Sequence, residues 1–214
     1  MTLLLSFFVM QYVVMSWMLF RRGVASEYIV GSASPLLFIW VIFWPVYHHF
    51  SFILYGLVLI SLPLVIAQWP YAIMQQLKLS WSIPEFGFMP MIVLVLNLSV
   101  AAILFYLEAA FGFAIALSLC LASSMASFAD KKEHIKLFLP FNPEQTLWGH
   151  VILLFMITLL CSWSLHIYFS VPQMATLSIS AFAALAASLG RALFPHAWSN
   201  TGVLVGMAAA LWLF

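Results

Sequence analysis

Long apolar runs separated by short polar connections make up nearly the whole chain. Most of these runs approach the roughly 20 apolar residues with which a helix crosses a hydrocarbon core about 30 Å thick. They do not show the alternating period of a barrel strand. Because a backbone inside a bilayer must satisfy its own hydrogen bonds, such runs predict membrane-spanning helices. We therefore expect an all-α, polytopic integral membrane helical bundle.

Eight segments of this kind can be distinguished, and two of the divisions are weak. Only the polar YHHF at 47–50 separates the second segment from the third, and the last segment is too short to cross a full-thickness bilayer upright. We therefore expect six to eight transmembrane helices in a single transmembrane domain, 1–214. Between the third and fourth segments, 68–87 combines Trp, Tyr and Pro, which predicts a loop at the membrane interface. The segments are 2–20, 28–46, 51–67, 87–106, 109–129, 147–169, 173–193 and 201–214.

Composition and net charge narrow the class of protein further. The chain is 66% hydrophobic and 6% charged, whereas a soluble domain has roughly 25% charged residues. A formal net charge of +1 argues against nucleic-acid binding, which requires a basic face. Cys120 and Cys161 lie inside apolar runs, so neither a disulfide framework nor a thiolate metal site is expected. The expected partners are membrane lipid and a second membrane protein.

The basic residues are distributed in a way that predicts the orientation of the chain. If the N-terminus is outside and all eight segments cross, every basic residue falls on the cytoplasmic side, in agreement with the positive-inside rule. The loop 130–146, which contains six charged residues, is then cytosolic. We expect a multi-pass protein of a bacterial inner membrane. The basic residues are Arg21, Arg22, Lys78, Lys131, Lys132, Lys136 and Arg191.

Two features of the apolar segments bear on packing and on chemistry. The small residues of AFAALAASLG at 181–190 and GVLVG at 202–206 predict two helices whose backbones approach closely. Among the ionisable residues, Glu108 is expected to be hydrated in a tight connection. His150 and His166 fall at opposite ends of one segment, so they cannot share a metal site.

The loop 130–146 is the best candidate for chemistry. Its acidic residues carry the oxygen ligands that magnesium prefers, and its lysines could face phosphate groups. The alternative is that these are the solvated charges of a cytosolic loop whose lysines set the topology. The residues are Asp130, Glu133 and Glu144, with Lys131, Lys132 and Lys136.

Two stretches, SSMASFADKKEHIKLFLPFNPEQTLWGHVILLF and AALAASLGRALFPHAWSNTGVLVGMAAALWLF, carry a family resemblance. Their order resembles the dolichol kinase and phytol kinase family, relatives of the membrane phosphatidate cytidylyltransferases, over about the last 95 residues. The resemblance implies transfer of phosphate from CTP, with magnesium, to a polyprenol or similar alcohol. It implies a nucleotide site formed by Asp130, Lys131, Lys132, Asn142, Gln145, Thr146 and Asn200.

Compared residue by residue, the chain keeps the order of the family's motifs, but several residues that carry the family's chemistry are replaced. Thr146 matches the Lys-Thr-x-x-Gly motif, but its lysine is replaced by Gln145; Asn200 matches an Asp-Asn motif whose acid has become Ser199. The acid of an earlier Gly-Asp motif falls on Ser123. Serine cannot replace a carboxylate that holds a metal, and glutamine offers no positive charge to a phosphate. The expected function is a catalytically degenerate, lipid- or partner-binding membrane protein; the alternative is an active lipid-alcohol kinase or cytidylyltransferase-like enzyme.

Overall fold

The computed structural model of the chain describes the second half of the sequence almost completely. The first 32 residues are described only at scattered positions, and most of the expected first segment and interface loop lies outside the described residues. The described residues are 10, 11, 14, 15, 18, 19, 21–23, 33–47, 49–68, 89–132, 136, 137, 139, 141–169, 172–195 and 198–214.

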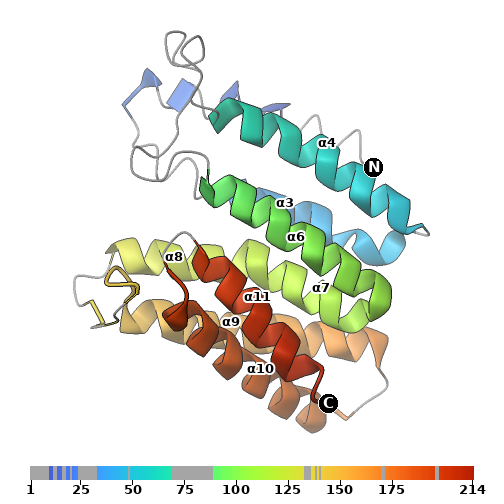
Figure 1. Cartoon of the computed structure of the whole chain (residues 1–214). Helices are drawn as coiled ribbons and strands as arrows, with labels where there is room; N and C mark the ends of the chain where they lie inside the picture. The colour runs from blue at the N-terminus through green and yellow to red at the C-terminus, as the bar shows by residue number, and fades with distance from the viewer. Residues whose placement is uncertain are drawn as a thin grey trace. The chain divides into compact units, whose positions relative to one another are not determined.

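The chain divides into two compact units, Met1–Leu96 and Asn97–Phe214, and the division falls inside a helix. All the regular elements described are helical, which confirms the predicted all-α class (Figure 1). They are α3 (Ala33–Ile42), η1 (Trp44–Val46), α4 (Phe50–Gln68), α6 (Met89–Leu107), α7 (Ala109–Leu117), η2 (Ser118–Ala122), α8 (Ser123–Lys132), α9 (Leu147–Tyr168), α10 (Gln173–Leu193) and α11 (Ser199–Leu211).

In the first unit, the weak division predicted at 47–50 is a real break between helices. α3 ends at Ile42, a short 3-10 turn follows, and α4 begins at Phe50. A Cβ atom at Gly56 would lie 2.8 Å from the buried ring of Trp40. Because Gly56 has no side chain, the indole of Trp40 in α3 can pack against α4 at this point.

The core of the second unit is one long helix. α7, η2 and α8 form a continuous apolar helix of 24 residues, Ala109–Lys132, of which 78% is buried over its most apolar stretch. η2 is a turn of π-helix, Ser118–Ala122, a feature often found where a helix carries functional residues. The hydroxyls of Ser118 and Ser124 donate to carbonyls four residues earlier, so these polar groups are satisfied within the helix.

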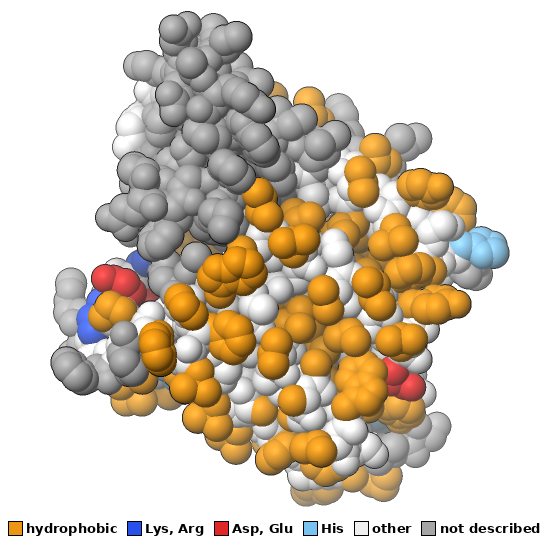
Figure 2. Space-filling view, in the orientation of Figure 1, with side chains coloured by type: hydrophobic (Ala, Val, Ile, Leu, Met, Phe, Trp, Pro, Cys, Tyr) orange, Lys and Arg blue, Asp and Glu red, His pale blue; other side chains and the backbone are white. Residues whose placement is uncertain are grey.

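Three of the described helices are long and apolar enough to cross a membrane: Ala109–Lys132, Leu147–Tyr168 and Gln173–Leu193. The last two are buried over only 33% and 39% of their most apolar stretches. Large apolar side chains are exposed at every fourth position along α9, and hydrophobic side chains are spread over the whole described surface seen in Figure 2. A surface of this kind is typical of a protein that inserts into a membrane. The α9 stripe consists of Leu147, Val151, Phe155, Leu159, Trp163 and Ile167.

The predicted close approach of two small-residue faces is confirmed. α10 and α11 lie side by side (Figure 1). A Cβ atom at Gly202 would come within 2.2 Å of the carbonyl oxygen of Gly190, and one at Gly206 within 2.3 Å of the carbonyl oxygen of Ala186. These contacts are between backbones, which cannot move aside as a flexible side chain can. The two helices can therefore pack this closely only with glycine at these positions.

We expect Gly202→Ala to destabilise the second unit by about 1–3 kcal/mol, the usual cost of inserting a methyl group into a packed contact. The control is Val205→Ile, which adds one methyl group at a side chain that is 46% exposed on the same helix. Cys120 and Cys161 are free and buried, so thermal unfolding can be followed with a thiol-reactive dye. A melting temperature of Gly202→Ala equal to that of the control would contradict this packing.

Candidate functional site

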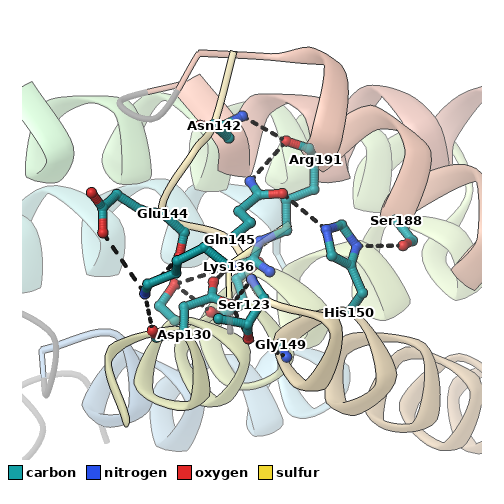
Figure 3. Close-up of polar contacts among 12 residues, drawn as sticks. Ser123, Asp130, Lys136, Asn142, Glu144, Gln145, Gly149, His150, Ser188 and Arg191 are labelled. Atoms are coloured by element: carbon teal, nitrogen blue, oxygen red, sulfur yellow. Dashed lines mark hydrogen bonds and ion pairs between the residues drawn. The ribbon is translucent and has the colours of Figure 1, made fainter. Parts of the chain in front are cut away.

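Asp130, in the last turn of α8, forms a buried ion pair with Arg191 of α10 (Figure 3). Its Oδ2 atom lies 2.6 Å from Nη2 of Arg191, and the two side chains are 11% and 3% exposed. Its other oxygen, Oδ1, accepts hydrogen bonds from the backbone N–H of Thr146 at 2.8 Å and from the Thr146 hydroxyl at 2.9 Å. Both carboxylate oxygens of Asp130 are therefore occupied by donors from the protein.

Thr146 and Gly149 connect this carboxylate to the start of α9. Thr146 is the N-cap of α9, and its hydroxyl oxygen accepts a hydrogen bond from the N–H of Gly149 at 3.0 Å. A Cβ atom at Gly149 would lie 2.0 Å from Oδ1 of Asp130. Glycine at 149 thus leaves the space into which the carboxylate fits, and the end of α8 is joined to the beginning of α9.

The loop before Thr146 satisfies the C-terminal end of α10. Pro195 has no N–H to donate to the carbonyl of Arg191 four residues earlier, so this carbonyl needs another donor. The side-chain amides of Asn142 and Gln145 each donate to it at 3.1 Å, and Asn142 also donates to the carbonyl of Phe194. Two predicted nucleotide-binding residues therefore act as a cap for α10.

A chain of hydrogen bonds continues from Gln145 to His150 and Ser188. Oε1 of Gln145 lies 2.9 Å from Nε2 of His150, and Nδ1 of His150 lies 2.7 Å from Oγ of Ser188. Because the amide nitrogen of Gln145 donates to Arg191, its oxygen faces His150, which assigns the proton of the neutral ring to Nε2. Nδ1 then accepts from the hydroxyl of Ser188.

A serine, a histidine and an orienting third residue are the parts of a nucleophile and its general base. Ser188, however, lies inside α10, where the neighbouring backbone N–H groups make hydrogen bonds within the helix. They are not free to stabilise an oxyanion, which acyl transfer requires. The contacts of His150 therefore favour a role in fixing α9 against α10.

The charged residues of the loop fall into two groups. Lys136 donates to the carbonyls of Asp130 and Glu144, and its Nζ atom lies 3.8 Å from the Glu144 carboxylate. Lys131 and Lys132 are exposed in the last turn of α8, where positive charge interacts favourably with the helix dipole. Within the described part of the chain, no three His, Cys, Asp or Glu residues are grouped so that they could hold a metal ion. Glu133, the third predicted magnesium ligand, lies outside the described residues.

Some buried polar atoms of the cluster have no hydrogen-bond partner among the described residues. These atoms include Nη1 of Arg191 and Oγ of Ser123. Ser123, Ser127 and Asp130 follow at intervals of four and three residues, so they share one face of α8. Nη2 of Arg191 reaches both Asp130 and, at 3.5 Å, the hydroxyl of Ser127. Buried polar atoms of this kind are commonly satisfied by an internal water molecule.

Of the seven residues predicted to bind nucleotide, four lie together in this cluster: Asp130, Asn142, Gln145 and Thr146. Lys131 and Lys132 lie beside it on the surface, and Asn200 is in the first turn of α11. Sequence reasoning missed the central residue, Arg191. Its position at the end of an apolar helix rich in small residues was the available signal, because an ionisable residue in such a helix usually has a specific partner.

Comparisons of the chain with models of protein families, with curated proteins and with solved structures find no match. The resemblance to the dolichol and phytol kinases therefore stays a hypothesis. The function must be inferred from the geometry of the cluster.

We expect Asp130→Asn to lower stability by about 3–5 kcal/mol, because it leaves the charge of Arg191 buried without a counter-ion. Glu144→Gln is the matched control. It makes the same chemical change at a carboxylate whose side chain is 70% exposed, where an ion pair contributes about 0–1 kcal/mol.

The double variant Asp130→Asn/Arg191→Gln should lose less than the sum of the two single variants, because neither charge is then left alone. Melting temperatures of all four proteins in one detergent give the comparison. Additive losses would show that the two side chains do not interact.

Proposed function

We propose that this chain is a non-catalytic membrane protein that keeps the frame of the dolichol and phytol kinase family and binds a lipid or a partner protein. The bonding of Asp130 carries this proposal. Transfer of a phosphoryl group requires metal ions and cations placed against the phosphates. Asp130, the acidic residue that is buried among the described part of the cluster, instead accepts hydrogen bonds from Arg191 and Thr146 with both of its oxygens.

The neighbouring motif residues support the same proposal. Gln145 stands at the position where the family has a lysine, and its amide caps α10 and contacts His150. Thr146 and Gly149, which match the family motif, cap α9 and accommodate Asp130. Each of these residues has a structural role that requires no nucleotide.

We also propose that the chain crosses the membrane six to eight times, with its N-terminus outside and the loop 130–146 in the cytosol of a bacterium. The contact between Arg191 and Asp130 supports this topology, since it puts two of the predicted cytosolic positions at the same end of the second unit. The positive-inside rule then assigns that end to the cytoplasm.

The second candidate is an active lipid-alcohol kinase or cytidylyltransferase-like enzyme that uses CTP and magnesium. Two observations favour it. Lys131 and Lys132 are exposed and directly follow Asp130 in the sequence, and the buried Nη1 atom of Arg191 has no acceptor in the part of the chain that the structure describes. Magnesium binding at Asp130 would require the carboxylate to leave Thr146 or Arg191.

Nucleotide binding distinguishes the two candidates. A ligand present at 100 times its dissociation constant stabilises the folded state by about 2.7 kcal/mol. We expect neither CTP nor ATP, with or without magnesium, to raise the melting temperature, and we expect no phosphorylation of an added polyprenol. A magnesium-dependent rise that is lost in Lys131→Ala/Lys132→Ala, and kept in the control Arg21→Ala/Arg22→Ala, would establish the enzyme instead.

Cysteine labelling tests the topology. Glu144 is exposed in the loop, and the native Cys120 and Cys161 are buried, so background labelling should be low. In intact cells, Glu144→Cys should be protected from a membrane-impermeant maleimide and should react after the cells are opened. A cysteine in place of Glu108, in the connection between α6 and α7, should react in intact cells. The reverse pattern would overturn the proposed orientation.

A further inference from the structure

One part of the loop between α8 and α9 is apolar. Residues 137–141 read LFLPF and directly follow the charged stretch that ends at Lys136. Phe141 is 55% exposed, and Leu137 and Leu139 are half-buried. Loops that face water are normally polar, and exposed apolar groups gathered in one place usually mark a contact with another apolar surface. The loop therefore has a surface that water alone does not explain.

This apolar segment is attached to the end of α10. At its start, the N–H of Leu137 donates to the carbonyl of Gln145 at 2.8 Å, and the side-chain amide of Gln145 donates to the carbonyl of Arg191. At its other end, the residue after Phe141 is Asn142, whose amide donates to the same carbonyl. Both ends of the segment are therefore held close to the last turn of α10.

The last turn of α10 and the first turn of α9 carry exposed apolar side chains. Both helices are long and apolar enough to cross a membrane. Leu193 in α10 is 64% exposed, and Trp148 in α9 is 58% exposed. Tryptophan is enriched at the depth where a spanning helix leaves the hydrocarbon core. Phe141 is thus held at the end of the second unit where two such helices reach the membrane boundary.

The backbone of the segment suits surroundings of low polarity, where an unpaired N–H group is costly. Pro140 and Pro143 have no N–H group. The N–H groups of Leu137 and Leu139 donate to carbonyls within the loop, at 2.8 and 2.9 Å. These four residues therefore present no unpaired N–H group to a bilayer.

We propose that this part of the loop lies on the bilayer, with the ring of Phe141 inserted among the first methylene groups of the acyl chains. The inference depends on membrane insertion of the second unit and not on the resemblance to the lipid kinases. Glu144 stays in water, because its side chain is 70% exposed and extends away from the end of α10 (Figure 3). The loop thus has one edge that faces lipid and one that faces water.

Continuity favours the bilayer over a partner protein as the occupant of this surface. If α9 and α10 cross the membrane, lipid covers the exposed side chains of Trp148 and Leu193. Phe141 extends the same apolar boundary, since Asn142 ties it to the carbonyls of Arg191 and Phe194 on either side of Leu193. A partner protein would have to displace lipid from this boundary before it could reach Phe141.

A fluorescent probe at position 141 tests this inference in phosphatidylcholine vesicles, at a density at which most vesicles hold a single copy. Phe141→Cys and the control Glu144→Cys are labelled with an environment-sensitive dye, while the native Cys120 and Cys161 are buried and should react little. We expect the probe at 141 to emit at a shorter wavelength than the probe at 144. Lipids with a nitroxide about 5–10 Å below the headgroups, the depth of an interfacial segment, should quench the probe at 141. Aqueous iodide should quench mainly the probe at 144.

A second measurement uses the unaltered chain, so it does not depend on the folding of a variant. A phospholipid with a photoactivatable diazirine at the start of its acyl chain should label Phe141 and not Glu144, as located by mass spectrometry. Equal iodide quenching at the two positions, with no label on Phe141, would overturn the inference. A probe at 141 shielded from both iodide and nitroxide lipid would also overturn it, because a protein partner or a second copy would then cover this surface. Neither result bears on nucleotide binding, so the non-catalytic proposal would stand or fall separately.

Discussion

The second unit depends on one buried ion pair, between Asp130 and Arg191. In surroundings of low dielectric constant, either charge alone would be strongly destabilising, so the ends of α8 and α10 must stay together. Thr146 shares the carboxylate and brings the start of α9 to the same point. Three helix ends are thus joined by a single side chain.

The position of Asp130 is set by the helix that carries it. Ser123, Ser127 and Asp130 lie on one face of α8, and the π turn of η2 immediately before Ser123 sets the rotation of this face relative to α7. Gly190 of α10 approaches the backbone of Gly202 and so sets the short distance at which α11 packs against α10. Arg191 follows Gly190 directly, so the same close packing positions the guanidinium. Backbone packing and the buried charge therefore support one another.

The helices were largely predictable, and the use of their polar residues was not. The apolar run 147–169 became Leu147–Tyr168, and 173–193 became Gln173–Leu193, because the length of an apolar run limits where a helix can begin and end. The partner of Asp130 lies 61 residues later, a separation that no local pattern reveals. By comparison with the family motif, Gln145 only replaces a lysine. Its role in the structure follows from Pro195, which has no N–H and so leaves a carbonyl of α10 to be capped by Gln145. Only the folded chain brings these residues together.

The concentration of charged and polar residues in 130–146 is explained by the helices that it connects. Helix ends near a bilayer have backbone groups that need partners, and Asn142, Gln145 and Thr146 supply them. A metal ion taking the carboxylate of Asp130 would leave Arg191 without its counter-ion inside the protein and would remove the acceptor of the two hydrogen bonds that Thr146 donates. Nucleotide binding would have to offset both losses and rebuild the contacts among three helix ends. The same loop residues can therefore serve as caps or as ligands, and their hydrogen bonds are those of caps.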